Sequence, residues 1–338
     1  MANYQPSILL DAIGIVTDPF NKHEFRPGYF GATEAFMKYR DYSVPNLAEI
    51  RKSPLRTTTV KYLTRTNQEP VTARSCTVSA ALGDSGTANV TWATRGFTVM
   101  TSEKQFDNNY IAQSKAFAND LYNGMLNVHE DLETLAVAYL EANKTGVNLG
   151  SAFMGTFDSG DDIFDIAYAD KTRYYNYLKT VMRENLYRGE LNVIQNVAAD
   201  AVMWEQMAQG MANSANQQYQ YRDLNFIESN YVTTASDYLI NSYVIPDHAV
   251  AMLDWIPPLN IRGRKEGAYE WTTMGDLFGL PITWSVFKTT ECASTVSTGG
   301  DTQDLVTKYE VTADFGFVKA PLTAAGETPI YKFGLKTT

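Results

Sequence analysis

The stretch of sequence that decides the fold runs from residue 117 to residue 139 and reads FANDLYNGMLNVHEDLETLAVAY. Its large apolar residues recur at spacings of 4, 4, 3, 4, 3 and 4, which places one apolar stripe along a helix. A cap region at 102–105 and a stop at 145–146 predict that the helix covers residues 103–144. Such a helix would be about 60 Å long at ~1.5 Å per residue, well above the usual length. Two shorter helices, split near Gly124, are the alternative.

Upstream of this helix, residues 56–102 predict a long β-hairpin. The runs 71–82 and 90–101 are rich in Thr and Val, alternate between apolar and polar residues, and flank the sequence GDSG at 83–86. A long two-stranded hairpin is only marginally stable alone in water. We therefore expect it to be supported by a partner surface.

The first 55 residues predict an extended arm. Pro and Gly interrupt them repeatedly, yet they carry many large apolar and aromatic residues, which disordered tails lack. This combination favours a segment that docks its aromatic side chains on another surface. That surface is either the core of the same chain or a neighbouring chain.

Downstream, the pattern is mixed helix and strand. Helices are expected over 171–188 and 198–213, with a short buried strand at 191–194 between them. Strands are then expected at 240–245, 282–287, 308–317 and 329–335. The segments 257–267 and 291–304 are expected to be loops, the first with a solvated basic tip at Arg262, Arg264 and Lys265.

Composition excludes several classes of protein. The chain has 338 residues, of which 44% are hydrophobic, so it can bury a core and is not disordered. A net charge of −10 argues against tight binding of nucleic acid. Two cysteines exclude a disulfide scaffold, and no apolar run or N-terminal pattern suggests a membrane span or a secretory signal. The 21 Tyr, 16 Phe and 5 Trp residues suit either a large core or extensive protein contacts.

The sequence nominates no catalytic, cofactor-binding or metal-binding residue. His129 and Glu133 share a helix face with Glu130 beside them, but two ligands make a weak metal site, so a solvated polar face is expected. The acids between Asp158 and Asp162 do not have calcium-loop spacing and are expected to form an exposed turn. Cys76 is expected to be a small buried residue. A pair of carboxylates that meet from distant positions stays open as an enzyme hypothesis.

The order of these elements, together with local sequence, resembles the major capsid proteins of tailed bacteriophages, which have the Hong Kong 97-type fold. The similar phrases are GELNVI at 189–194, WEQMA at 204–208, IESN at 227–230, YVIPD and AVAM within 243–252, and WTTMGD at 271–276. The resemblance implies an α+β fold with an N-terminal arm (1–55) and an extended β-hairpin, the E-loop (56–102). It also implies a peripheral domain with a spine helix (103–145 and 305–338) and an axial domain (146–304).

The function implied by the resemblance is structural. Hexamers and pentamers of one chain would form an icosahedral shell that encloses double-stranded DNA without sequence-specific binding. The protein would be a virion component assembled in the host cytoplasm, with no cofactor, no membrane and no catalytic role. The resemblance leaves room for separate scaffolding, portal and decoration proteins. An encapsulin-like shell, another phage structural protein and an unrecognised hydrolase are the alternatives.

Overall fold

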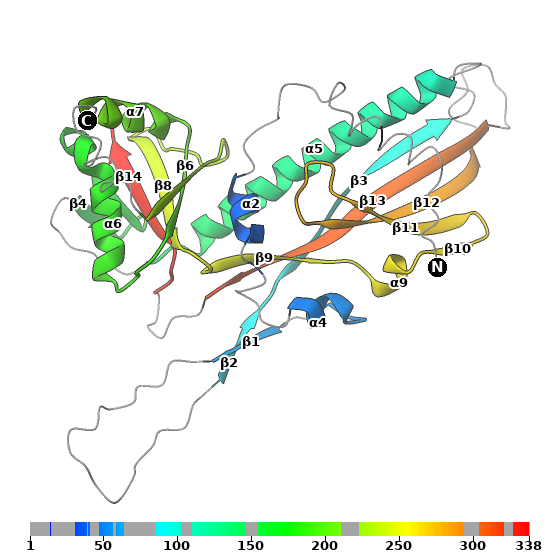
Figure 1. The fold of residues 1–338 in the computed structure, drawn as a ribbon, viewed down its shortest axis with the longest axis horizontal. Helices are drawn as coiled ribbons and strands as arrows, with labels where there is room; N and C mark the ends of the chain where they lie inside the picture. Colours follow the sequence, from blue (N-terminus) through cyan, green and yellow to red (C-terminus); the bar gives the residue numbers. More distant parts are fainter. Residues whose placement is uncertain are drawn as a thin grey trace, which may run out of the picture.

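The computed structural model of the chain describes residues 14, 31–38, 40, 47–56, 59–63, 85–102, 110–146, 155–210, 223–293, 304–320 and 327–337. Within these residues the chain forms two six-stranded sheets and a separate pair of strands that projects from the body (Figure 1). One long helix lies along the first sheet, and shorter helices accompany the second. The predicted α+β class is confirmed.

The long helix is α5, and it runs without a break over Tyr110–Ala142, 33 residues. The alternative of two helices split at Gly124 is wrong. The apolar stripe faces the sheet, and Leu121, Met125 and Leu132 are each 0% exposed. Burial of this stripe explains why the helix continues through a glycine, since tertiary packing supplies most helical stability in proteins. The predicted start of the helix, residues 103–109, lies outside the described residues.

The first sheet, the long sheet, packs against α5. It consists of β3 (Trp92–Ser102), β9 (Val250–Trp255), β10 (Arg264–Glu266), β11 (Tyr269–Gly275), β12 (Thr283–Ala293) and β13 (Asp304–Lys319). The strand order is β10-β11-β12-β13-β3, and β9 also pairs with β13. The strands predicted at 282–287 and 308–317 are confirmed, within β12 and β13.

The 16-residue strand β13 organises the long sheet. Along one edge it pairs with β3 over residues 306–316. Along the other edge it pairs first with β12, over residues 304–312, and then with β9, over residues 314–319. All three pairings are antiparallel. The second arm of the predicted hairpin, 90–101, therefore lies mostly in β3 and belongs to the body of the subunit.

The projecting pair consists of β1 (Thr59–Leu63) and β2 (Ser85–Asn89), which are antiparallel. The turn predicted at residues 83–86 is wrong, because Ser85 pairs with Leu63 and Gly86 pairs with Tyr62. The composition of GDSG is typical of a turn, but here its second half begins a strand. The connecting residues 64–84, which include Cys76 and the run 71–82, lie outside the described residues.

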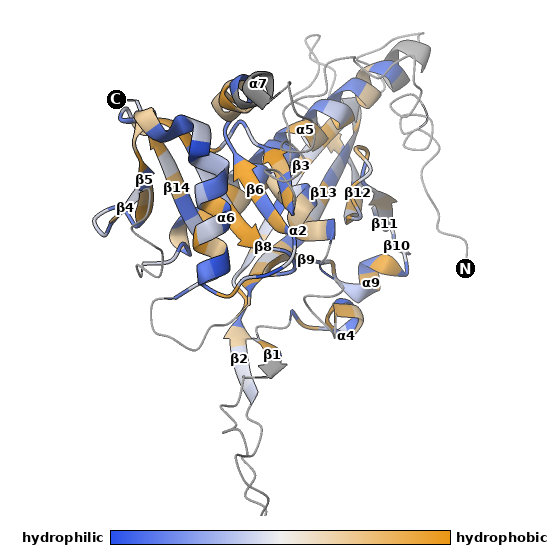
Figure 2. Cartoon of the chain, turned by 60° about the vertical axis from the view of Figure 1, so that its left-hand side comes forward, coloured by the Kyte–Doolittle hydropathy of each residue, from blue (hydrophilic) through white to orange (hydrophobic). Residues whose placement is uncertain are grey.

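The second sheet, the short sheet, has the order β4-β5-β14-β8-β6-β7. Its strands are β4 (Gly155–Asp158), β5 (Ile163–Ile166), β6 (Leu191–Gln195), β7 (Leu224–Glu228), β8 (Tyr238–Pro246) and β14 (Tyr331–Lys336). The pairs β5–β14 and β6–β7 are parallel, and the others are antiparallel. The central strands β6 and β8 are strongly apolar (Figure 2), and all five residues of β6 are buried. The strands predicted at 191–194, 240–245 and 329–335 are thus confirmed.

Two predicted helices are confirmed with changed ends. The segment predicted at 171–188 forms a 3-10 turn, η2 (Tyr168–Arg173), followed by α6 (Tyr174–Glu184). This helix ends before the predicted stop because Leu186 adopts a left-handed φ of 67°. The next helix, α7 (Ala198–Gly210), begins at the predicted residue, and positions 211–213 lie outside the described residues.

The predicted domain boundaries did not place every strand in the sheet that it joins. β14 was assigned to the region of the spine helix, yet it lies in the short sheet between β5 and β8. Conversely, β10, β11 and β12 were assigned to the axial region, yet they extend the long sheet. The chain crosses between the sheets several times, and the sequence pattern of a strand does not reveal which partner it pairs with.

Candidate functional site

The described part of the N-terminal arm docks on its own chain. Helix α2 (Gly31–Lys38) contacts α5, β9, β6 and β7 and so lies where the two sheets meet (Figure 1). Phe36 and Met37 are buried in the same core as α5. A Cβ on Gly31 would lie 2.3 Å from Cγ2 of Ile227, so α2 can approach the short sheet this closely only with glycine there. The sequence left open whether the arm docks on its own chain or on a neighbouring chain, and these residues dock on their own chain.

Glu133 of α5 anchors the beginning of α2. Its carboxylate accepts hydrogen bonds from the backbone N–H groups of Ala32 (3.0 Å) and Thr33 (2.9 Å), and from the Thr33 hydroxyl (2.8 Å). The Ser229 hydroxyl donates a fourth bond at 2.6 Å. Glu133 is 0% exposed, so the expectation of a solvated polar face is wrong at this residue. The expectation failed because all of its partners lie about 100 residues away in sequence.

His129, one turn earlier, is also buried, which corrects the same expectation. Its Nε2 lies 2.6 Å from Oδ1 of Asp276, in the connection between β11 and β12. Asp276 also accepts hydrogen bonds from the indole N–H of Trp284 (3.2 Å) and the backbone N–H groups of Phe278 (2.9 Å) and Leu280 (3.1 Å). This pair therefore fastens the β11–β12 connection to the long helix. Glu130 does not share this site.

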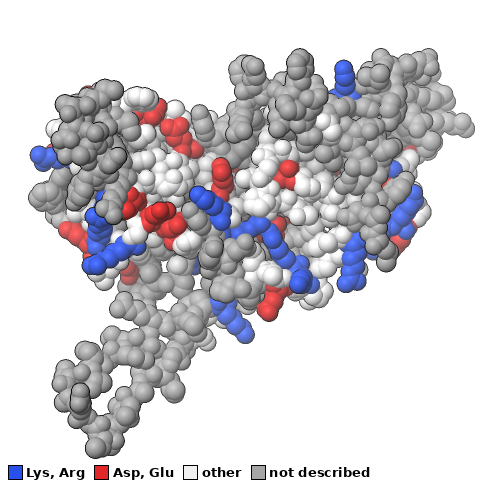
Figure 3. Space-filling model, viewed as in Figure 1, with Lys and Arg blue, Asp and Glu red and all other residues white. Residues whose placement is uncertain are grey.

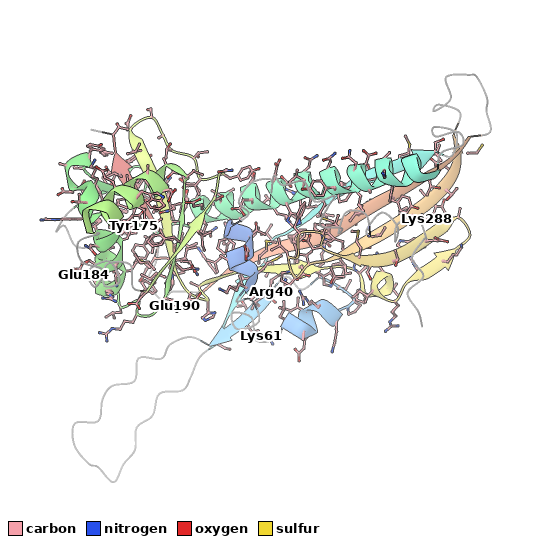
Figure 4. All side chains as sticks on the ribbon, turned by 45° about the horizontal axis from the view of Figure 1, so that its top comes forward. Arg40, Lys61, Tyr175, Glu184, Glu190 and Lys288 are labelled. Carbon is pink, nitrogen blue, oxygen red and sulfur yellow. The ribbon has the colours of Figure 1, made fainter. Side chains whose placement is uncertain are left out.

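A second buried acid holds the next part of the arm. Asp254 of β9 accepts a hydrogen bond from Arg40 at 2.7 Å and pairs with Arg51. Arg40, labelled in Figure 4, also donates to the carbonyl of Pro281. The side chains of Arg40 and Asp254 are only 5% and 6% exposed. Sequence reasoning missed this pair, although a lone acid inside the apolar run 249–256 was the available signal.

The hairpin is fixed to the body at its base. A small core joins helix α4 (Leu47–Lys52), strand β1 and strand β9. Its buried members are Leu47, Ile50, Val60, Val90, Ala251 and Leu253. The β1–β2 pair leaves the body from this core. Five positions of β1 pair with five of β2, and most of the β2 residues are exposed. The N-terminal segment and the base of the hairpin therefore share one anchorage on β9.

Glu141, near the end of α5, links the helix to the short sheet. Lys144 (2.6 Å), Lys332 (2.9 Å) and the Tyr243 hydroxyl donate to its carboxylate. Partial burial alone would raise the pKa of Glu141, but these hydrogen bonds outweigh burial and lower the pKa to about 2. The carboxylate is therefore ionised throughout the neutral range.

Several large apolar side chains are exposed on the described surface. Trp204 on α7 is 63% exposed, and Tyr269 on β11 is 51% exposed. The tip predicted to be a solvated basic loop includes β10, where Arg264 stacks on the Trp271 ring at 3.8 Å and Lys265 pairs with Glu270. Basic and acidic residues are interspersed over the described part of the face in Figure 3. Exposed aromatic and apolar side chains beside arginine are typical of protein interfaces.

The acids between Asp158 and Asp162 lie in the turn between β4 and β5. Asp158, Asp161 and the residues between them are exposed, which confirms the expected acidic turn. Among the described residues, no three His, Cys, Asp or Glu side chains are grouped as metal ligands. A search of the same residues finds no helix long and apolar enough to cross a membrane.

No family model matches the sequence, and no curated protein matches it. Solved structures are similar to it. One from Mycobacterium phage Che8 covers 92% of this chain and 93% of its own, at 12% identity and a TM-score of 0.48. The capsid of Ralstonia phage GP4 covers 83% and 84%, at 10% identity and a TM-score of 0.42. The capsid asymmetric unit of cyanophage Pam1 covers 83% and 86%, at 10% identity and a TM-score of 0.41.

Proposed function

We propose that this chain is a major capsid protein of the tailed-bacteriophage class, with the Hong Kong 97-type fold. In this proposal the protein is a structural building block whose hexamers and pentamers form an icosahedral shell around double-stranded DNA. It acts in the virion and assembles in the host cytoplasm. The proposal rests on the subunit's own geometry and on the order of its elements along the chain.

The projecting hairpin is the observation that carries the proposal. Among the described residues, β1 and β2 form a two-stranded sheet that leaves the body at the β9 anchorage (Figure 1). Beyond the α4 core at its base, the pair gains no third strand from the described residues, and a two-stranded sheet is marginally stable in water. A neighbouring subunit supplies the missing surface in a closed shell. The contact with neighbours expected of the arm concerns residues 1–30, which lie outside the described residues apart from Gly14.

The elongated body supports the same function. A helix of 33 residues lies along the long sheet, and the short sheet sits at one end of it (Figure 1). We propose that α5 and the long sheet form the peripheral domain, and that the short sheet with α6 and α7 forms the axial domain. In this proposal β10, β11 and β12 belong to the peripheral domain and β14 to the axial domain, which differs from the boundaries expected at 145 and 305. The exposed Trp204 and Tyr269 then offer contact area on both domains.

A structural role without catalysis or cofactor fits the use of the buried polar groups. His129, Glu133 and Asp254 each hold one segment of the chain against another, through the contacts described above. The net charge of −10 suits a container that must not hold DNA tightly. Scaffolding, portal and decoration proteins are compatible partners in this proposal.

The test shortens the hairpin without disturbing the body. Leu63 and Ser85 are paired, so a two-residue Asn-Gly turn in place of residues 64–84 closes the β1–β2 ladder directly. We expect a folded subunit with unchanged circular dichroism and thermal midpoint, and no shells by sedimentation. The physical reason is that the removed residues would contribute contacts between subunits, not contacts within the core.

A matched variant replaces residues 64–84 with a Gly/Ser segment of equal length. It keeps the connection and removes the side chains, so we expect it to fold and to fail in assembly as well. Shell formation by both variants at the level of the unmodified protein would overturn the proposal. Unfolding of the shortened subunit would overturn it too, because the hairpin would then belong to the core.

A further inference from the structure

The joint between the two sheets contains a buried carboxylate whose hydrogen-bond donors, among the described residues, are all uncharged. Glu133 is 0% exposed, and its four hydrogen-bond donors are two backbone N–H groups and two hydroxyls. An ionised carboxylate can accept about four hydrogen bonds, so this shell is filled. The backbone donors belong to the first turn of α2, where the helix dipole favours negative charge.

Three separate parts of the chain meet on this carboxylate. Oε2 accepts from α2, through both donors of Thr33. Oε1 binds the N–H of Ala32 and also the hydroxyl of Ser229, which directly follows β7 at the edge of the short sheet. Glu133 itself belongs to α5, which packs on the long sheet. One side chain therefore connects the arm, the long helix and the short sheet.

A second polar connection between α5 and the short sheet differs in kind. Glu141 lies eight residues later, and its side chain is 43% exposed and paired with two lysines. Solvent screens such an exposed pair, so its contribution is small. Removing a hydrogen-bond acceptor from a buried site costs much more stability than removing one from an exposed ion pair, because buried donors are left without partners. The buried contact of Glu133 is therefore the stronger of these two polar connections.

We propose that Glu133 is a latch that couples the N-terminal segment to the short sheet, so that α2 and the end of β7 are held or released together. Gly31 supports the coupling from the other side, because α2 also touches Ile227 of β7 directly. The arm is then a part of the joint and not only an attachment to it. This inference concerns a single subunit and does not depend on the proposed assembly.

The test is amide hydrogen exchange on the full-length chain, read in peptides that cover α2 and residues 224–232. In Glu133→Gln, either orientation of the amide turns its NH2 group toward a backbone N–H, of Ala32 or of Thr33. We expect exchange to accelerate about tenfold or more in both peptides. Asp120→Asn, an exposed carboxylate earlier on the same helix, is the matched control and should leave both peptides unchanged.

The milder variant Ser229→Ala removes the hydroxyl that donates to Oε1 of Glu133. The latch predicts faster exchange at Ala32 and Thr33, although neither residue is altered. The proposal is overturned if Glu133→Gln accelerates exchange in α2 while residues 224–232 stay protected, since Glu133 would then be a simple helix cap. It is also overturned if Ser229→Ala leaves α2 unchanged.

Discussion

The close approach of β3 to the long helix predicts an unusual response to a glycine substitution. Gly124 lies in the middle of α5, directly under the ring of Phe97 from β3. A Cβ on Gly124 would lie 2.2 Å from Cδ2, 2.6 Å from Cε2 and 2.8 Å from Cγ of that ring. Ordinary carbon contacts are about 3.5–4.0 Å. The ring thus occupies the space that a side chain would need.

Two opposing effects set the result of Gly124→Ala. Alanine is favoured over glycine in a helix interior by about 1 kcal/mol. Forcing an extra carbon into a packed site costs about 1–3 kcal/mol. We therefore expect Gly124→Ala to lower the free energy of unfolding by roughly 1 kcal/mol, although the same change stabilises most helices.

Removal of the ring should reverse the sign. In a Phe97→Ala background the space above Gly124 is empty, so only the helix preference is left and Gly124→Ala should stabilise by about 1 kcal/mol. The two substitutions are therefore coupled by about 1–3 kcal/mol.

The assay is guanidinium denaturation of the four proteins of this double-mutant cycle, followed by circular dichroism at equal protein concentration. The reasoning is refuted if Gly124→Ala changes stability equally in both backgrounds, because the Phe97 ring would then not occupy that space.

Two further substitutions test the anchors. Asp254→Ala removes the buried acid that pairs with the buried Arg40 and should cost about 3–5 kcal/mol by denaturation. Glu266→Ala, at a side chain that is 66% exposed, should change stability by less than about 0.5 kcal/mol, and similar losses in the two variants would contradict the buried anchor. Glu141 has its pKa lowered from 4.5 to about 2, so its stabilising effect is present above pH 4.5 and is lost as the pH falls towards 2. We therefore expect Glu141→Gln to be less stable than the unmodified protein at pH 7 and equally stable near pH 2, as read from thermal midpoints. The difference at pH 7 should be under about 1 kcal/mol because the carboxylate is partly exposed. A difference that persists in acid would contradict this prediction.

The sequence predicts local structure well where burial produces a period. The stripe from Phe117 to Tyr139 indicates the long helix because one face packs on a sheet along its whole length. The alternation in 308–317 indicates a strand for the same reason, since one face of β13 is covered over residues 306–313. The α+β class follows from such elements and needs no knowledge of their partners.

Pairing over long distances could not be predicted in this way. The run 90–101 alternates whether its partner is a hairpin arm or β13, some 200 residues later, and the structure selects β13. Two polar residues of the helix, His129 and Glu133, were expected in solvent because helical spacing does not reveal which segments pack against that face of the helix. Their partners come from the β11–β12 connection, α2 and the end of β7. Such contacts become visible only when the tertiary fold is known.

The most direct test of the proposed function is negative-stain electron microscopy of the purified full-length protein, alone and with a scaffolding partner. A shell-forming subunit predicts closed particles, or mixtures of hexamers and pentamers, in at least one of these preparations. A protein that stays a uniform monomer in both would contradict the proposal, and so would one that forms only tubes or a single ring.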